Sequence, residues 1–370
     1  MKKILLLGGG YANLSFLKNL NKDKFNEYEL TLISKENHHY QSVLLHEAVS
    51  SGKDVSVSFD EILPKGFSFI QDEIKEIKEK EVLGQKGRYE YDILIVGLGF
   101  SSDDFKIPGV KEHALSMVDF KNSLKIHEKI ENYGDNLEIV VCGGGFSGIE
   151  LIGNLAKDLK TVYKNFKLKC VEAMPIILPM FEETLSLKAK KYLEDLGVEF
   201  YLSSKILKCE KDGVIIQNGD KEEKIKADII LWTAGVKGNE VIQNSPFFKS
   251  QRSKVEVDAF LNPANQETEM KNIFILGDCA ALKAPDGRFF PPTAQLANEE
   301  GKYLAKVFNS DFKLQESFSY QSKATICSLG NDYAIGVIGS TKIEGKIASY
   351  IKKLVELKWL IKIKGLKALF

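Results

Sequence analysis

Two glycine-rich turns, each placed after an apolar run and before a helical pattern, constrain the fold of this 370-residue chain more than any other feature. The first turn lies near residue 8 and the second near residue 143, about 135 residues further on. A tight glycine turn between a strand and a helix points backbone N–H groups and the positive end of the helix dipole at a diphosphate. The duplication therefore predicts two nucleotide-binding folds in one chain.

Short β-rich runs alternate with helical patterns along most of the chain, which is typical of parallel sheets covered by helices. The length allows two to three domains at roughly 150 residues each. The predicted fold class is α/β, with two Rossmann-like dinucleotide-binding domains. We expect buried strands over residues 2–7, 29–33, 93–96, 138–142, 167–171, 229–232 and 273–276.

The second turn completes the GxGxxG pattern of dinucleotide-binding folds. Glu172 follows the next predicted strand, 29 residues after Gly143. A carboxylate at that place accepts hydrogen bonds from both ribose hydroxyls and repels a 2′-phosphate, so the pattern favours NADH over NADPH. The candidate cofactor-binding residues of this fold are Gly143, Gly145, Phe146, Ser147, Gly148 and Glu172.

The first turn departs from the pattern, because Asn13 stands where the third glycine is expected. Close packing of the helix on the strand usually leaves no room for a side chain there, so a plain strand-turn-helix stays open as an alternative. Ser34 follows the next strand and offers one hydrogen bond to a ribose, unless it only ends a solvated strand. The candidate cofactor-binding residues are Gly8, Gly10, Tyr11, Ala12, Ser34 and Lys35.

A further signal lies far downstream, where the apolar run 273–276 ends in Gly277 and Asp278. An Asp there can bond the sugar chain of a flavin, while an Asp that only caps a helix is the alternative. Two dinucleotide folds together indicate a flavin and a nicotinamide, because a flavin accepts hydride and passes electrons on. We therefore expect FAD and NADH. We expect no metal site, since the five cysteines lack zinc spacing.

The domain boundaries are predicted where the patterns reset, at residues 107–110 and 249–254. We expect the FAD-binding domain to be split by the inserted NADH-binding domain. The predicted ranges are 1–112 and 253–330 for FAD, 113–252 for NADH, and 331–370 for a C-terminal basic helical segment that associates with a membrane or a second copy.

These motifs resemble the two-dinucleotide-binding flavoproteins of the pyridine nucleotide-disulfide oxidoreductase superfamily, and within them the type II NADH:quinone oxidoreductases. The resemblance covers nearly the whole chain and rests on residues 7–11, 44–48, 91–99, 143–150, 232–236, 277–280 and 291–297. It implies FAD-dependent oxidation of NADH, with two electrons passed to a membrane quinone and no proton pumping. It also adds Leu98, Gly99, Gly235 and Leu296 to the cofactor-binding candidates.

The resemblance implies three catalytic candidates. Glu150 matches the glutamate of the family's GxE element, and it would orient nicotinamide or relay a proton if burial raises its pKa; an acid that only complements the helix dipole is the alternative. Gln295 opens the family's AQxxxQxG element and would bond a quinone carbonyl. Glu299 replaces the second glutamine of that element, which would tune quinone choice, supply a proton or mark a different acceptor.

Other functions stay open at this point. Sulfide:quinone oxidoreductases share the fold but need paired cysteines at the flavin, and here Cys327 is the only loose candidate. Disulfide reductases are excluded because residues 38–60 hold no CxxxxC. A diverged NADH flavoprotein with a soluble acceptor is another alternative. An inactive nucleotide-sensing scaffold is the alternative outside the enzymes, because Asn13, Ser34 and Glu299 depart from the family pattern.

The charge is balanced overall, with 51 basic and 51 acidic residues, so the chain has no global basic field for nucleic acid. The overall balance conceals an uneven distribution of charge along the chain. Residues 342–370 hold eight lysines and two glutamates, a local charge of +6, and the remainder carries −6. Lysines interleaved with Leu, Ile and Trp359 suit an interfacial helix on an anionic membrane. A docking helix or a homodimer contact is the alternative.

The location follows from the same patterns. No apolar run approaches about 18 residues, and the N-terminal run of four is too short for a secretory signal. We therefore expect a cytoplasmic protein attached peripherally to the inner face of the cell membrane, with NADH and quinone as its substrates.

Overall fold

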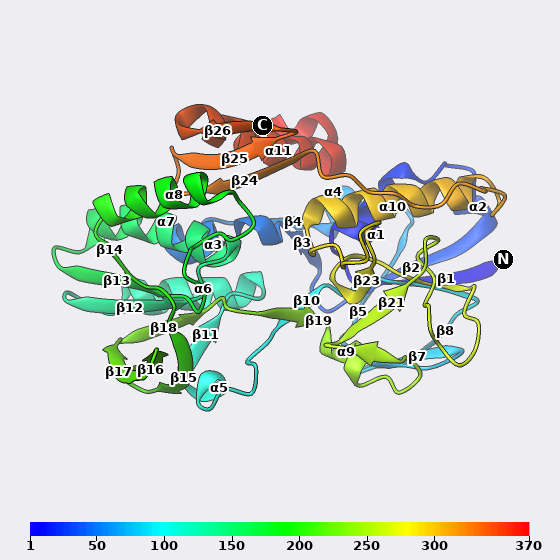
Figure 1. The fold of residues 1–370 in the computed structure, drawn as a ribbon. Helices are drawn as coiled ribbons and strands as arrows, with labels where there is room; N and C mark the ends of the chain where they lie inside the picture. The colour runs from blue at the N-terminus through cyan, green and yellow to red at the C-terminus, as the bar shows by residue number, and fades with distance from the viewer. Residues whose placement is uncertain (370) are drawn as a thin grey trace.

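The computed structural model describes residues 1–369, and its core is two five-stranded parallel sheets with helices against their faces (Figure 1). The first sheet has the order β22 (Ile273–Ile275), β9 (Ile93–Val96), β1 (Lys2–Leu7), β2 (Tyr28–Ser34), β5 (Ser68–Gln71). The second has the order β11 (Ala114–Ser116), β18 (Ile229–Trp232), β12 (Leu137–Cys142), β13 (Phe166–Val171), β14 (Val198–Tyr201).

The seven predicted strands are all present, within one residue at each end. Their apolar runs are buried on both faces, as in β9 and β18, where every residue is buried. This is why a central parallel strand is recognised as a continuous apolar run rather than an alternating one. Strand β22 pairs with β9 although the whole second sheet lies between them in the chain. The predicted fold class, with one dinucleotide-binding fold inserted into another, is confirmed.

The longer helices cover these sheets. They are α1 (Tyr11–Asn19), α3 (Leu45–Ser51), α6 (Phe120–Glu131), α7 (Phe146–Val162), α8 (Glu183–Asp195) and α10 (Ala294–Asn309), beside the short α2 (Lys24–Glu27) and α4 (Phe59–Ile62). Small sheets flank them: β3 (His38–Tyr40) with β4 (Ser56–Ser58), β6 (Ile74–Ile77) with β7 (Glu81–Gly84) and β8 (Arg88–Glu90), β15 (Lys205–Glu210) with β16 (Gly213–Asn218) and β17 (Lys221–Lys226), and β20 (Ser250–Gln251) with β21 (Lys254–Val257) and β23 (Ala280–Leu282).

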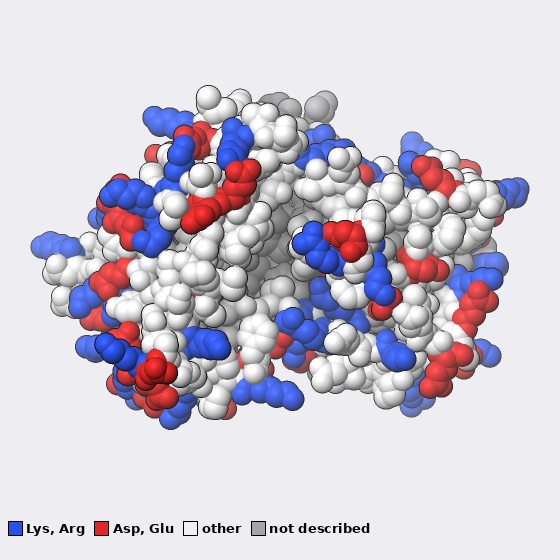
Figure 2. Space-filling model, viewed as in Figure 1, with Lys and Arg blue, Asp and Glu red and all other residues white. Residues whose placement is uncertain are grey.

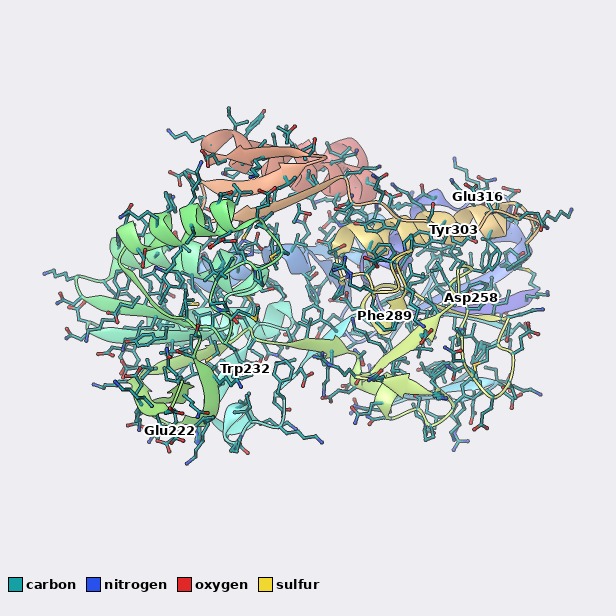
Figure 3. The ribbon with its side chains drawn as sticks, in the orientation of Figure 1. Glu222, Trp232, Asp258, Phe289, Tyr303 and Glu316 are labelled. Atoms are coloured by element: carbon teal, nitrogen blue, oxygen red, sulfur yellow. The ribbon has the colours of Figure 1, made fainter. Side chains whose placement is uncertain are left out.

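The chain passes between the two halves on an antiparallel pair, β10 (Phe100–Ser102) and β19 (Val236–Gly238). After β10, the segment through α5 (Val110–His113) packs on the second half, and Trp232, labelled in Figure 3, donates its indole N–H to the Asp103 carbonyl at 2.9 Å. After β19, α9 (Glu240–Gln243) packs on the first half, and Ser245 Oγ accepts the Ile77 N–H at 2.8 Å.

The C-terminal region forms a separate unit that contacts both halves (Figure 1). It consists of β24 (Ala324–Ser328), β25 (Ala334–Ile338), β26 (Thr341–Glu344), α11 (Gly345–Lys364) and the short turn η3 (Gly365–Leu369). Cys327 and Ile335 join the core of the second half, whereas Trp359 and Ile363 join the core of the first. The predicted basic helix is present, and among residues 1–369 no helix combines the length and apolar character needed to cross a membrane.

Candidate functional site

A cavity of about 1000 Å³ runs along the carboxyl ends of the first sheet's strands, and a hollow is visible between the two halves in Figure 2. Ten of the predicted cofactor residues line it together: Gly8, Gly10, Tyr11, Ala12, Ser34, Lys35, Leu98, Gly99, Gly277 and Asp278. These residues come from four separate strand ends. In an open α/β sheet, this edge is where ligands bind.

The first glycine turn lies close against the backbone that follows β9. Gly8 has φ +91°, and a Cβ there would lie 2.4 Å from the Gly97 carbonyl oxygen, so only glycine fits. Gly10 precedes the first residue of α1, which leaves the N–H groups of the helix's first turn facing the cavity. The turn therefore presents the N–H groups and helix dipole that a diphosphate requires.

Asn13, which departs from the glycine pattern, is accommodated in the turn by two hydrogen bonds, although its Oδ1 is buried and has no partner among residues 1–369. Its side chain is fully buried and donates to the Leu7 carbonyl at 2.8 Å and to the Gly8 carbonyl at 2.7 Å. In the second turn, a Cβ at Gly148 would lie 2.0 Å from the Gly143 carbonyl oxygen. At the first turn the amide binds the carbonyls that a side chain would otherwise meet, so the expected steric obstacle to an Asn at this position is absent.

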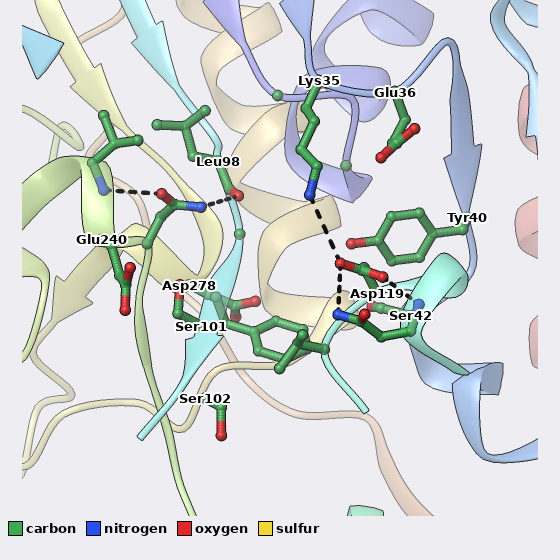
Figure 4. Close-up of a pocket in the computed structure, with 18 of the residues that line it drawn as sticks. Lys35, Glu36, Tyr40, Ser42, Leu98, Ser101, Ser102, Asp119, Glu240 and Asp278 are labelled. Atoms are coloured by element: carbon green, nitrogen blue, oxygen red, sulfur yellow. Dashed lines mark hydrogen bonds and ion pairs between the residues drawn. The ribbon is translucent and has the colours of Figure 1, made fainter. Parts of the chain in front are cut away.

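Charged side chains line the cavity beside the end of β2 and the start of α6 (Figure 4). Lys35 Nζ lies 3.8 Å from Asp119 Oδ2, and this ion pair joins the first half to the start of α6. Glu36 also lines the cavity. The sequence analysis missed Glu36 and Asp119, although Glu36 follows β2 much as Glu172 follows β13. Leu98 in turn accepts a hydrogen bond from Asn239 at its carbonyl, at 3.0 Å.

Two acids lie at the Gly277 turn, Asp278 half-buried at the cavity and Glu300 fully buried behind it. Burial raises the pKa of Asp278, against the opposing effect of Lys254. Glu300 on α10 is fully buried, and its Oε2 accepts the Gly277 N–H at 2.5 Å. Burial raises the pKa of Glu300 to about 8, and Asp278 adds to the rise. The sequence analysis missed Glu300, since nothing in its helical pattern separates it from the solvent-facing Glu next to it.

The predicted residues of α10 do not line the cavity. Leu296 is buried in the core, and its N–H donates to Thr293 Oγ1, the N-cap of the helix, at 3.0 Å. Gln295 lies beside it in the first turn and is partly exposed. Glu299 pairs with Lys302 at 2.7 Å. The cavity is instead met by the neighbouring positions 293, 294 and 297.

The second glycine turn repeats the arrangement at the carboxyl edge of the second sheet, where Gly145 precedes α7. Glu172 directly follows β13 and accepts the Gly144 N–H at 2.6 Å and the Met174 N–H at 2.8 Å, one with each carboxylate oxygen. Phe146 packs against Phe181, while Ser147 is exposed at the start of the helix. Gly235 follows β18 at the same edge, and its carbonyl accepts the Asp103 N–H at 3.0 Å.

Glu150 lies in a buried cluster that joins α7 to α3 and α11. Its carboxylate forms an ion pair with Lys352, accepts the Ser328 N–H at 3.1 Å and lies 3.7 Å from His46 Nδ1. Burial alone would raise the pKa of Glu150, but Lys352 and His46 outweigh it, so the pKa is lowered. The raised pKa considered from the sequence is therefore wrong, because the partner comes from a helix 200 residues downstream in the chain.

The other members of the cluster follow the same rules. Burial lowers the pKa of His46 to about 4, so the ring is neutral near neutral pH. Burial also lowers the pKa of Lys352, but Glu150 and Glu356 outweigh it and the pKa is raised. The shared proton of the ion pair therefore resides on Lys352. All five cysteines are unpaired and buried, Cys327 included, so Cys327 is not the loose thiol considered from the sequence.

Known proteins resemble this chain over nearly its whole length. A sequence model of the pyridine nucleotide-disulphide oxidoreductase family matches residues 2–301, and the chain belongs to that family. Two relatives, from Staphylococcus aureus (strain NCTC 8325 / PS 47) and Staphylococcus epidermidis (strain ATCC 12228 / FDA PCI 1200), are each 34% identical over 400 and 401 residues, which span 100% of this chain and 98% of each relative. Both are type II NADH:quinone oxidoreductases, and this chain is a member of the same family.

Solved structures share the fold. NDH2 from Plasmodium falciparum in complex with NADH has a TM-score of 0.87 at 21% identity, over 98% of this chain and 96% of that one. The sulfide:quinone oxidoreductase of Aquifex aeolicus has a TM-score of 0.81 at 18% identity, over 98% and 92%. At these identities the likeness concerns the fold alone.

Proposed function

We propose that this protein oxidises NADH with FAD and passes two electrons to a membrane quinone. The observation that carries the proposal is the cavity itself, where the glycine turn, the β2 end, the β9 end and the Gly277 turn converge opposite a second dinucleotide fold. Anaerobic mixing with NADH, followed by quinone, tests it: flavin absorbance should bleach with NADH and return with quinone. Bleaching by sulfide but not by NADH would contradict it.

The residues of the cavity fit FAD. Gly8 and Gly10 present no side chain on the wall of the cavity, and the start of α1 supplies N–H groups and a positive dipole for a diphosphate. Asp278 lines the same cavity and would accept a hydrogen bond from a hydroxyl of the flavin's sugar chain. When bound, FAD supplies a ring that accepts hydride from NADH and releases electrons to a second substrate.

The second fold would hold NADH. Glu172 is anchored by two backbone N–H groups, which leaves its remaining lone pairs for the ribose hydroxyls and places negative charge where NADPH carries its phosphate. Gly143, Gly145, Gly148 and Gly235 would surround the diphosphate and nicotinamide ends.

Glu172→Gln is expected to raise the KM for NADH about tenfold, because it removes the charge from hydrogen bonds worth roughly 1.5–3 kcal/mol. It should also narrow the preference for NADH over NADPH, since the repulsion of the phosphate is lost. Steady-state kinetics with both nucleotides measures the change. Glu199→Gln, on the exposed face of neighbouring β14, is the control. If the ratio of kcat/KM for NADH to kcat/KM for NADPH is unchanged, Glu172 does not contact the ribose.

Protons for the quinone would come through the Glu150 cluster. Reduction of a quinone to a quinol consumes two electrons and two protons. Lys352 holds a proton against Glu150 in a buried ion pair, so the pair, rather than Glu150 alone, is the proposed proton carrier. Gln295 and Glu299 on α10 remain candidates for contact with the quinone head, because Gln295 lies between positions 294 and 297, which meet the cavity, and Glu299 lies just beyond them on the same helix.

The domain boundaries fit best at β10 and β19. Residues after β10 already pack on the NADH-binding half, and residues after β19 pack on the FAD-binding half. We place the FAD-binding domain at residues 1–102 and 239–323 and the NADH-binding domain at 103–238. The C-terminal unit then starts at residue 324, because β24 pairs with β25 rather than with either main sheet.

The membrane contact would use one face of α11. Ile347, Tyr350, Leu354 and Val355 lie on one side of the helix and are 46–72% exposed, and Lys346 and Lys353 are exposed beside them. Apolar side chains with lysines at the edge suit an anionic lipid surface. Trp359 and Ile363, counted with this face from the sequence, are instead buried in the core of the first half. The lipid-facing part is therefore the beginning of the helix.

Leu354→Ser combined with Val355→Ser is expected to reduce binding to anionic vesicles at least about tenfold, since each buried aliphatic side chain contributes roughly 1.5–3 kcal/mol. Co-sedimentation at low and high salt measures it. Phe260→Ser, an exposed apolar residue remote in sequence, is the control. Unchanged binding, or a change in oligomeric state instead, would assign the face to a second copy of the chain.

A further inference from the structure

A chain of hydrogen bonds connects the C-terminal helix to the first glycine turn. Trp359 of α11 is buried, and its indole N–H donates to His39 Nε2 at 3.0 Å. His39 Nδ1 lies 3.0 Å from the Gly9 carbonyl oxygen, in the turn itself. Because a carbonyl only accepts, Nδ1 carries the hydrogen and Nε2 is the acceptor for Trp359. A neutral His39 therefore ties α11 to the turn.

Tyr11 fills the space beside this chain of bonds. Its ring lies 4.7 Å from the Trp359 ring and meets the His39 ring edge-on at 5.1 Å. Tyr11 is the first residue of α1 and lines the cavity. Trp359 therefore contacts the first residue of α1, the helix whose N-terminus faces the proposed diphosphate site.

Lys362 makes a second connection from α11 one turn further on. Its Nζ donates to Ser15 Oγ on α1 at 2.8 Å and to Asn298 Oδ1 on α10 at 2.6 Å. Ser15 Oγ in turn donates to the Asn298 carbonyl at 2.7 Å. Lys362 also lies over the Trp359 ring, 5.4 Å from its centre. Both helices that enclose the Gly277 turn and the first glycine turn are therefore held from α11.

We propose that Trp359, His39 and Lys362 are positioning residues, through which α11 holds the first glycine turn and the start of α1 in the geometry that receives the flavin diphosphate. A helix N-terminus binds phosphate only when its N–H groups are aimed at it. Any movement of the Gly9 peptide changes that aim. This inference rests on the proposed flavin site.

Trp359→Phe tests it, because phenylalanine keeps a ring against Tyr11 and removes only the donor to His39. We expect the dissociation constant of FAD to rise about tenfold, which corresponds to about 1.4 kcal/mol. Equilibrium dialysis of the holoprotein, followed by flavin absorbance, measures it. Lys358→Gln, exposed and next to Trp359 in the chain, is the matched control and should leave the constant unchanged.

The pH profile separates positioning from a general loss of packing. Burial lowers the pKa of His39 to about 4, with His38 adding to the effect and the Gly9 hydrogen bond opposing it. The titratable groups that face this network are Tyr11, Tyr40, Glu356 and Lys362, with Glu299 and Lys302 next to Lys362. Without the Trp359 donor, the neutral ring loses a stabilising hydrogen bond and its pKa rises. Acid release of FAD should then begin at a higher pH in Trp359→Phe than in the unaltered protein, by about one pH unit.

Two further variants complete the test. His39→Asn keeps a donor for Gly9 and should weaken FAD binding less than His39→Phe, which has none. Lys362→Met keeps the apolar part of the side chain and is expected to raise the dissociation constant of FAD about threefold. If one of these variants fails to fold, the other variants still test the proposal. If the unaltered protein binds no FAD, the proposed function fails. If it binds FAD and neither affinity nor pH profile changes in the variants, the positioning role is overturned.

Discussion

Glu150→Gln is expected to slow quinone reduction at least about 100-fold, the range in which loss of a positioned proton-transfer group falls. Glutamine preserves the shape and can still accept the Ser328 N–H, but it cannot neutralise Lys352. Lys352 would then be a buried charge without its ion-pair partner, and its pKa should fall. The proton that the pair holds near neutral pH would be lost.

The two half-reactions are measured separately by anaerobic stopped-flow mixing. Flavin bleaching by NADH should change less than about threefold, because the proposed role concerns the second half-reaction, while reoxidation by quinone carries the whole loss. Glu138→Gln is a matched control, since Glu138 pairs with the buried Lys169 at 2.6 Å at the opposite end of β12 from the glycine turn. Equal slowing of both half-reactions would instead place Glu150 in the binding of nicotinamide.

The sequence predicted the two sheets well because their strands are buried on both faces. A central parallel strand shows as an uninterrupted apolar run, and β9 and β18 are of this kind. The two glycine turns could also be predicted from the sequence, because a side chain at Gly8, Gly143 or Gly148 would clash with the backbone. The expectation that a side chain at position 13 would disturb the first turn considered only the volume of Asn13 and not its two hydrogen bonds to the carbonyls beside it.

Contacts across long chain distances could not be predicted. The pKa of Glu150 depends on Lys352, and nothing in either local pattern indicates that α7 and α11 meet. The same holds for α11 itself. The composition of α11 suits a lipid surface along its whole length, but its amphipathic pattern is interrupted. Only the packing shows that the exposed apolar side chains lie in the N-terminal part of α11, while Trp359 and Ile363 enter the core. Burial that depends on tertiary packing leaves little local signal.

Glu300→Gln is expected to stabilise the protein at alkaline pH, in contrast to most substitutions of a buried residue. Glu300 is fully buried, one of its oxygens accepts the Gly277 N–H, and the other has no partner among residues 1–369. Burial and the nearby Asp278 raise its pKa to about 8 in the folded chain, compared with an ordinary value near 4.5. Glutamine keeps the acceptor for Gly277 and carries no charge to desolvate.

Proton linkage determines how the stability of the folded protein changes with pH. Between pH 4.5 and 8 the folded protein holds a proton on Glu300 that the unfolded chain has released, so stability falls as pH rises through this window. The loss is complete above the folded pKa and amounts to roughly 4–5 kcal/mol by the conversion of 1.36 kcal/mol for each pKa unit. In Glu300→Gln this contribution is absent. The free energy of unfolding is measured with urea on the holoprotein from pH 5 to 8.5. As pH rises, Glu300→Gln should become more stable relative to the unaltered protein. The exposed Glu267→Gln should show the same pH dependence as the unaltered protein. Parallel curves for Glu300→Gln as well would mean that Glu300 is ionised in the folded protein, with its charge compensated through the Gly277 N–H and Lys254.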